Sequence, residues 1–278
     1  MDVQIALETI AADAARGDMV FPTHADIALR VRRLLDDPDC SVEQLSKLIA
    51  AEPLLAARIV AIANSAAYNA SGRSTSDVRS AVARLGFNTL RTLATAVVVR
   101  QMEGMTRAPE HRALAARLWE HTAHVAALAR VIARRVTRQD PEAAFFAGIV
   151  HEVGGFYLIA RAGAFPGLLD SDLESWAGER EAEVGRCVLR ALEVPEAVRQ
   201  AAETLWGGYL AMPAESLGDT LLLADQLSPV ESPLSELSGM GRHGMTVDID
   251  QLVDGEELSA ILADSADEVA SLIGALKA

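Results

Sequence analysis

Four side chains of the sequence could carry chemistry together: His121, His151, Glu152 and Asp225. Imidazole nitrogens and carboxylate oxygens are the ligands that divalent metals take in proteins, so these residues form a candidate metal site. His151 and Glu152 are adjacent and end an apolar run, and His121 lies with His124 in a second apolar stretch. The same residue types also suit a packing cluster, in which carboxylates accept imidazole N–H bonds and hold helices together. The residues by themselves leave both alternatives open.

Helices must position these side chains, because apolar residues recur at three-to-four spacing along most of the chain. Residues that start and stop helices divide the pattern: Pro53 begins one helix and Gly86 ends another. The spacing predicts helices over residues 24–36, from 41, 53–64, 76–86, 88–102, 110–136, from 140, 179–192, 195–206 and 217–227. An amphipathic pair of helices between residues 258 and 276 is expected to pack back onto the protein.

Length and composition favour an all-α fold. The chain has 278 residues, of which half are hydrophobic and only 4% are aromatic, a composition of packed amphipathic helices rather than sheets. We expect a two-part helical bundle with an N-terminal helix in 1–20, a helical part over 21–105, a second over 106–230, and a loop with amphipathic helices over 231–278. Residues 228–247, rich in Pro and Gly, are expected to form a loop or lid.

The net charge of the chain, and the absence of several known sequence motifs, argue against several classes of function. The formal net charge of -14 argues against a non-specific nucleic-acid binder, and residues 141–278 hold only seven Lys/Arg against 24 Asp/Glu. Four acidic residues among the first 20 argue against a secretory leader, and we expect a cytoplasmic protein with no membrane segment. The two cysteines are far apart and indicate no disulfide framework. Neither a phosphate-cradling glycine loop nor a GxSxG serine elbow occurs.

Asn64 and Ser65 end one of the expected helices and come shortly before Tyr68. Their side chains either bond the free carbonyls at that helix end or belong to a surface for a partner. Capping is the expected role, since Asn and Ser are common at helix ends.

Several motifs follow one another along the chain. Four lie in the first hundred residues, at Phe21–Asp39, Ser41–Leu54, Ala63–Tyr68 and Ala81–Phe87. Five more follow at Leu118–His121, Ala147–Gly154, Glu181–Gly185, Val194–Glu196 and Leu223–Asp225. In type and order these motifs resemble the HDOD family, the HD-related output domain of bacterial signalling proteins, and the resemblance covers about residues 21–230.

The resemblance implies an all-helical fold whose second part, the HD-like part, is built like the HD metal-dependent phosphohydrolases. It maps the family's metal ligands, a His, a His-Asp pair and a later Asp, onto His121, His151-Glu152 and Asp225. Glu152 departs from the family's Asp by one methylene. Glu181 stands where catalytic relatives have a His, and Leu205-Trp206 where they have paired histidines. HDOD proteins are regarded as non-catalytic, and these losses agree with that view.

The expected function is thus a non-catalytic bacterial signal-transduction module that regulates other signalling proteins through protein–protein interaction. We expect no catalytic residues and no cofactor, and we expect the metal site at His121, His151, Glu152 and Asp225 to be vestigial; a divalent metal there and self-association are left open. One alternative is a divalent-metal phosphohydrolase or phosphodiesterase that uses the same four residues. Another is a sensor of a small ligand such as a nucleotide, bound in a groove between the two parts beside residues 228–247.

Overall fold

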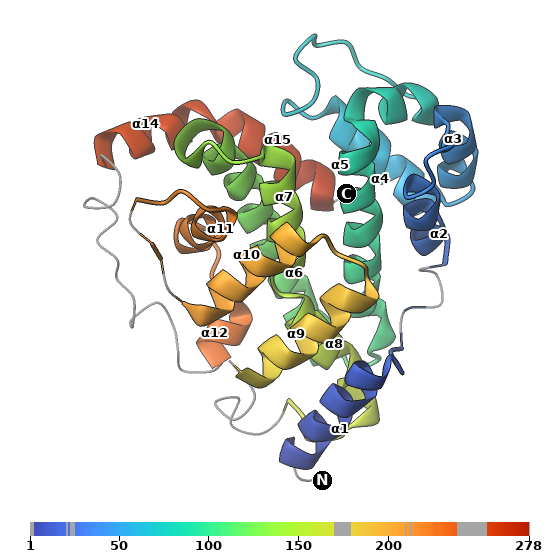
Figure 1. Cartoon of the computed structure of the whole chain (residues 1–278), viewed down its shortest axis with the longest axis vertical. Helices are drawn as coiled ribbons and strands as arrows, with labels where there is room; N and C mark the ends of the chain where they lie inside the picture. Colours follow the sequence, from blue (N-terminus) through green and yellow to red (C-terminus); the bar gives the residue numbers. More distant parts are fainter. Residues whose placement is uncertain are drawn as a thin grey trace. The chain divides into compact units, whose positions relative to one another are not determined.

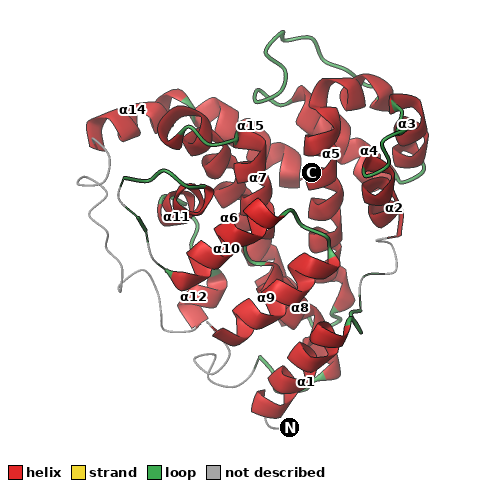
Figure 2. Ribbon diagram, viewed as in Figure 1, coloured by secondary structure: helices red, strands yellow, loops and turns green. Residues whose placement is uncertain are grey.

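The computed structural model describes residues 3–20, 22, 26–169, 179–208, 210–211, 213–237 and 255–277. Every regular element in these residues is a helix, and no strand occurs among them (Figure 2). The prediction of an all-α fold is confirmed.

Two compact units make up the chain, and each is assembled from two separate stretches of sequence. The larger unit consists of residues 1–20 and 102–261, and the smaller unit consists of residues 21–101 and 262–278. The expected boundaries near residues 20, 105 and 230 stay predictions, since compactness alone does not define a domain.

The smaller unit contains α2 (Asp26–Leu35), α3 (Val42–Ala50), α4 (Pro53–Asn64), α5 (Val78–Gln101) and α15 (Ala266–Lys277). Its helix ends follow the sequence: Ser41 and Gln44 form a capping box before α3, and Pro53 occupies the first turn of α4. Gly86 has a φ of 74° inside α5, so the predicted stop there is confirmed as a kink between two helical segments. The amphipathic α15 packs on α4, as expected.

The segment after α4 shows separate roles for Asn64 and Ser65. Ser65 Oγ donates to the Ile62 carbonyl at 2.7 Å, which confirms its capping role. Asn64 instead joins the two ends of the following loop: its Nδ2 donates to the Thr75 carbonyl at 2.7 Å, and its Oδ1 accepts from the Thr75 N–H at 2.8 Å. Arg84 donates to the carbonyls of Ala63 and Arg73, both at 2.8 Å, and holds the same loop.

The larger unit contains the elements around the candidate site (Figure 1). They are α1 (Val3–Arg16), a 3-10 turn (Met102–Met105), α6 (Pro109–Ile132), a π-helical turn (Ala133–Thr137), α7 (Pro141–Val150), α8 (Val153–Arg161), a 3-10 turn (Ala162–Ala164), α9 (Glu179–Ala191), α10 (Glu196–Gly207), α11 (Leu217–Gln226), α12 (Pro233–Leu237) and α14 (Gly255–Asp264), within which the unit ends. Helices α6 and α7 pack most extensively, α8 packs on α9, and α10 packs on α11.

Two sequence predictions in this unit need correction. The sequence predicts that the helix from residue 140 contains residues 145–154, but α7 ends at Val150 and a new helix, α8, begins at Val153. Within the expected loop of residues 228–247, residues 233–237 form the short helix α12. The remainder of that expected loop, residues 238–247, lies outside the described residues.

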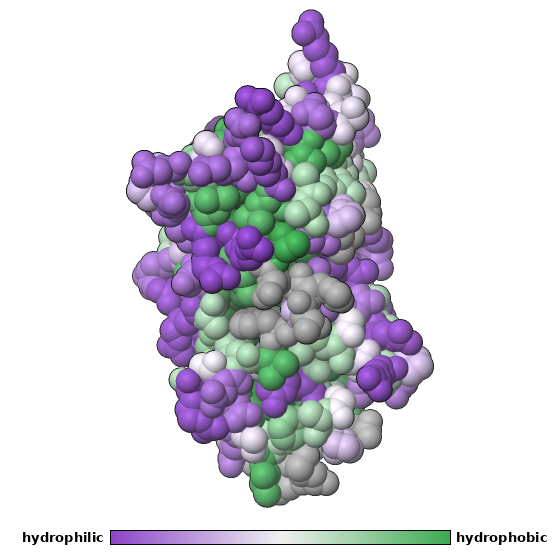
Figure 3. Space-filling model, turned by 90° about the vertical axis from the view of Figure 1, so that its right-hand side faces the viewer, coloured by the Kyte–Doolittle hydropathy of each residue, from purple (hydrophilic) through white to green (hydrophobic). Residues whose placement is uncertain are grey.

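One stretch, Pro141–Ala164, is long and apolar enough to cross a membrane, with a mean hydropathy of 1.5. It comprises α7 and α8, and 89% of its most apolar window is buried inside the protein, which is the pattern of a core helix. Hydrophilic side chains cover much of the face drawn in Figure 3, with apolar ones between them. Ile5 and Val20, 56% and 51% exposed, are the large hydrophobic residues that the described part of the chain exposes.

Candidate functional site

The four residues of the candidate metal site come from four helices or helix ends of the larger unit. His121 lies in the middle of α6, His151 follows the last residue of α7, Glu152 precedes α8, and Asp225 lies in the last turn of α11. Helices α6 and α7 can approach closely because residue 148 is glycine: a Cβ there would lie 2.3 Å from the Cα of Ala126. The break between α7 and α8 turns His151 and Glu152 toward α6 and α11.

The structure brings all four predicted residues together around His121 Nε2. That atom lies 3.2 Å from His151 Nε2, 3.3 Å from Asp225 Oδ1 and 3.9 Å from Glu152 Oε1. The candidate ligand atoms of His121, His151 and Glu152 all lie within 4.8 Å of one another. His124 takes no part in this cluster, because its Nδ1 bonds the Glu120 carbonyl of its own helix at 2.8 Å.

Backbone carbonyls fix the orientation of both imidazoles. His121 Nδ1 lies 2.8 Å from the Val230 carbonyl oxygen, and His151 Nδ1 lies 2.8 Å from the Gly148 carbonyl oxygen. A carbonyl oxygen only accepts hydrogen bonds, so each Nδ1 carries a hydrogen and donates it. In the neutral rings both Nε2 lone pairs then face each other, an arrangement that requires a cation, either a proton or a metal ion, between them.

The surroundings shift the pKa values of the two imidazoles in opposite directions. Burial lowers the pKa of His121, but the hydrogen bond to Asp225 and the charges of Glu152 and Asp225 outweigh burial and raise it above its ordinary value. The pKa of His151 is lowered, mainly because burial disfavours its charged form. Without a metal ion, His121 therefore takes up a proton more readily than His151 does.

Glu181, which stands in place of a histidine of the catalytic relatives, lies beside Glu152. Burial, the Glu152 charge and a hydrogen bond with Glu152 raise the pKa of Glu181 well above its ordinary value, although a backbone hydrogen bond from Gly155 lowers it. The hydrogen bond with Glu152 joins the two carboxyl groups across the site. The Glu181 carboxyl group fits at this place because residue 155 is glycine: a Cβ there would lie 3.0 Å from Glu181 Oε1.

Several groups that cover the site were not found from the sequence. The segment after α11 supplies the Val230 carbonyl, and Leu234 of α12 packs on Gly155, where a Cβ would lie 2.2 Å from Leu234 Cδ1. The Trp206 indole N–H donates to the His151 carbonyl at 3.2 Å. The two histidines are each 1% exposed, whereas the side chains of Glu152 and Asp225 are 14% and 24% exposed. Carbonyl acceptors and an apolar cover follow from the path of the backbone, which residue types do not reveal.

Three of these residues offer donors that a divalent transition metal could take. The candidate ligand atoms of His121, His151 and Glu152 lie within 4.8 Å of one another, whereas Asp225 lies close to His121 but does not belong to that group. Both imidazoles present Nε2 and donate Nδ1–H to a carbonyl, the usual support of a metal-bound histidine.

The chain matches one protein family in sequence and several solved proteins in structure. The model of the HDOD domain family matches residues 21–205. A crystal structure from Shewanella amazonensis named "Putative metal-dependent phosphohydrolase" is similar with a TM-score of 0.73 and 21% identity, over 99% of both chains. An "HDOD domain protein with unknown function" from Geobacter sulfurreducens has a TM-score of 0.62 and 23% identity, also over 99% of both chains.

A "Putative signal transduction protein" from Marinobacter aquaeolei is similar with a TM-score of 0.57 and 20% identity, over 93% of this chain and 60% of the other. No curated protein matches the chain. Identities in this range establish the fold alone, whereas the family match covers most of the sequence, including every motif of the family resemblance from Phe21 to Glu196. The chain belongs to the HDOD domain family.

Proposed function

We propose that the chain is a cytoplasmic bacterial signalling module that regulates another protein by binding it and turns over no substrate of its own. Membership of the HDOD family supports a regulatory role related to the HD proteins. A structurally similar protein carries a name that refers to signal transduction, which agrees with this role.

The closed state of the histidine cluster is the observation that carries the proposal. Hydrolysis of a phosphoester at such a cluster requires a free ligand position and a path by which the substrate reaches it. Here the two imidazoles are each 1% exposed, and Leu234 fills the space above Gly155. Only the two carboxylates reach the surface in part. The cluster is built to hold α6, α7, α8 and α11 together.

Hydrolysis assays on three matched proteins test this proposal. The unaltered chain, His151→Ala and His124→Ala are each loaded with Mn²⁺ and given bis(p-nitrophenyl) phosphate and a cyclic dinucleotide. We expect all three to hydrolyse both substrates at the protein-free rate, with His151→Ala unfolding at a lower temperature than the other two. Hydrolysis by the unaltered chain that His151→Ala abolishes and His124→Ala retains would overturn the proposal.

A metal-dependent phosphohydrolase is the second candidate, and one observation favours it. The two Nε2 lone pairs converge on one point beside two carboxylates, as the ligands of a catalytic ion do. His121, His151, Glu152 and Asp225 would hold the ion, and a divalent ion there would lower the pKa of a bound water. Elemental analysis of untagged protein purified without chelator tests this candidate: about one equivalent of metal, lost in His151→Ala but not in His124→Ala, would support it.

A further inference from the structure

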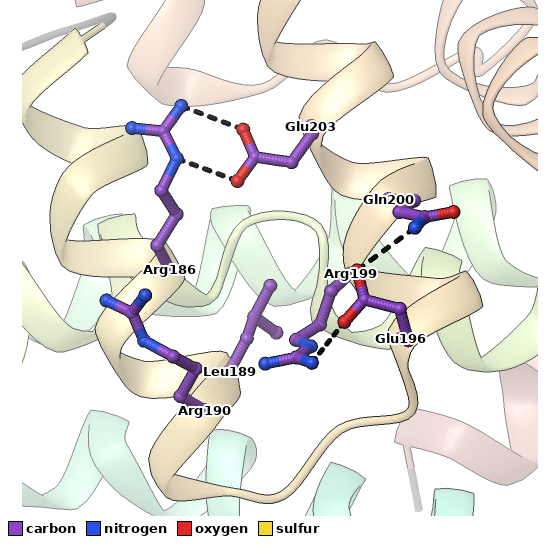
Figure 4. Close-up of a pocket in the computed structure, with 7 residues that line it drawn as sticks. All are labelled: Arg186, Leu189, Arg190, Glu196, Arg199, Gln200 and Glu203. Atoms are coloured by element: carbon purple, nitrogen blue, oxygen red, sulfur yellow. Dashed lines mark hydrogen bonds and ion pairs between the residues drawn. The ribbon is translucent and has the colours of Figure 1, made fainter.

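Three arginine side chains from two neighbouring helices line one cavity of the larger unit (Figure 4). Arg186 and Arg190 come from α9, and Arg199 comes from α10. The cavity has a volume of about 270 Å³, and its other lining residues are Leu189, Glu196, Gln200 and Glu203. Residues 141–278 contain only seven Lys/Arg against 24 Asp/Glu, so three of those seven basic side chains meet at one place.

Two of the arginines have a carboxylate partner within the cavity wall. Arg186 donates two parallel hydrogen bonds to the Glu203 carboxylate, from Nε at 2.7 Å and from Nη2 at 2.8 Å. Arg199 pairs with Glu196 one turn earlier on α10. Three guanidinium groups and two carboxylates leave the cavity with one net positive charge.

Arg190 carries that remaining charge. Its Nη2 donates to Cys187 Sγ at 3.3 Å, and a thiol sulfur is a weak acceptor. No dashed line joins Arg190 to another residue in Figure 4, and no carboxylate of the described residues forms an ion pair with it. Arg190 also lies one helical turn from Arg186, where like charges repel. Arg199 lines the same cavity with its guanidinium group, although its Nε is enclosed and has no hydrogen-bond partner among the described residues.

We propose that this cavity binds the phosphate group of a small molecule, held by Arg190 and Arg199. A tetrahedral phosphate offers oxygens to guanidinium groups on several sides at once, and arginine forks match phosphate geometry. One net positive charge and a volume of about 270 Å³ suit a single phosphate group with a small substituent rather than a polyphosphate. The buried Leu189 forms an apolar wall for that substituent. This site is separate from the histidine cluster and does not depend on the function proposed for it.

Calorimetric titration at fixed ionic strength tests the phosphate site. Inorganic phosphate, glycerol 3-phosphate and acetate are each titrated into the full chain in the presence of EDTA, so that no metal at the histidine cluster contributes. We expect saturable phosphate binding in the millimolar range, weakened roughly tenfold or more by Arg190→Gln through loss of a charge-assisted hydrogen bond. Arg107→Gln removes an exposed charge of the same unit away from the cavity and is expected to leave binding unchanged.

Inorganic phosphate and glycerol 3-phosphate distinguish a free phosphate ion from a phosphate ester as the natural ligand. Tighter binding of glycerol 3-phosphate identifies an esterified phosphate as the ligand, and equal or weaker binding identifies the free ion; either supports the site if Arg190→Gln weakens it. No saturable binding, or binding that Arg190→Gln leaves unchanged, overturns the proposal. Acetate binding as tight as phosphate binding overturns the assignment to phosphate.

Discussion

Gly148 has two roles in the histidine cluster. Its carbonyl accepts from His151 Nδ1, and its lack of a side chain lets α7 approach the backbone of α6 at Ala126. We expect Gly148→Ala to lower the free energy of unfolding by about 3 kcal/mol or more, because the added methyl group meets backbone that cannot move aside. Urea denaturation measures the loss. Gly163→Ala is the control, since nothing lies within 4 Å of a Cβ there, and an equal loss in both variants would contradict the argument.

Leu234 is a single side chain that covers the candidate site. It is 4% exposed and packs against Gly155, beside Glu181. We expect Leu234→Ala to cost about 2–5 kcal/mol of stability and to let diethylpyrocarbonate, which modifies neutral imidazole, reach His121 and His151. Peptide mass mapping would report the modification. Leu258→Ala, at another buried leucine of the same unit, controls for general loosening, and equal labelling of the two histidines in both variants would argue against a cover.

At the scale of elements, Asp77 starts α5 and its stability contribution depends on pH. Its carboxylate accepts from the Ser80 N–H at 2.8 Å, and the hydrogen bonds of Ser80 lower the pKa of Asp77. A depressed pKa in the folded state stabilises the fold above the unfolded pKa of about 3.9, and this contribution is lost as the pH falls through the folded pKa. We expect Asp77→Asn to lower the Tm at pH 6 by more than at pH 3. Thermal unfolding at both pH values measures this, and a constant difference would refute it.

Helix positions in this protein follow from local sequence, whereas breaks and loop closures depend on distant residues. Ser41, Pro53 and Gly86 mark helix ends by chemistry that acts within one turn, and their predictions are confirmed. The break after Val150 has no such residue, because His151 and Glu152 leave the helix to meet α6 and α11. Asn64 closes a loop onto Thr75, eleven residues later, which helix-end statistics do not foresee.

At the scale of the whole molecule, the C-terminal helix belongs to a unit built mainly from the first hundred residues. Leu272 and Leu276 of α15 are 1% and 0% exposed, and Ser271 Oγ accepts from the Ala66 N–H at 3.0 Å. We expect Leu272→Ala with Leu276→Ala to cost about 4 kcal/mol or more. Gly274→Ala, on the same helix with nothing within 4 Å of its Cβ, is expected to cost nothing. Chemical denaturation compares the variants, and a negligible loss in the double variant would show that α15 is dispensable.

The candidate site was predictable in its members but not in its environment. Residue types and the HDOD resemblance pointed to His121, His151, Glu152 and Asp225, and the structure places the last three within 3.9 Å of His121 Nε2. The cover over the imidazoles and the carbonyls that orient them come from residues with no chemical signature of their own. The arginine-lined cavity was missed because its arginines lie on two consecutive helices, and only the packing of α9 against α10 brings them together. A ligand groove between the two parts stays a prediction.

Each unit combines stretches that are far apart in the sequence, and this has a consequence for folding during synthesis. The smaller unit takes residues 262–278 from the end of the chain, and the larger unit takes residues 1–20 from its beginning. A nascent chain that has reached Gln101 therefore carries α1 before α8 and α9 exist, and α2–α5 before α15 exists. Domains usually fold as units during synthesis, N-terminal first. Here α4 keeps its α15-binding surface open until α15 has been translated, so a ribosome that stalls after α11 holds a smaller unit that lacks one of its helices.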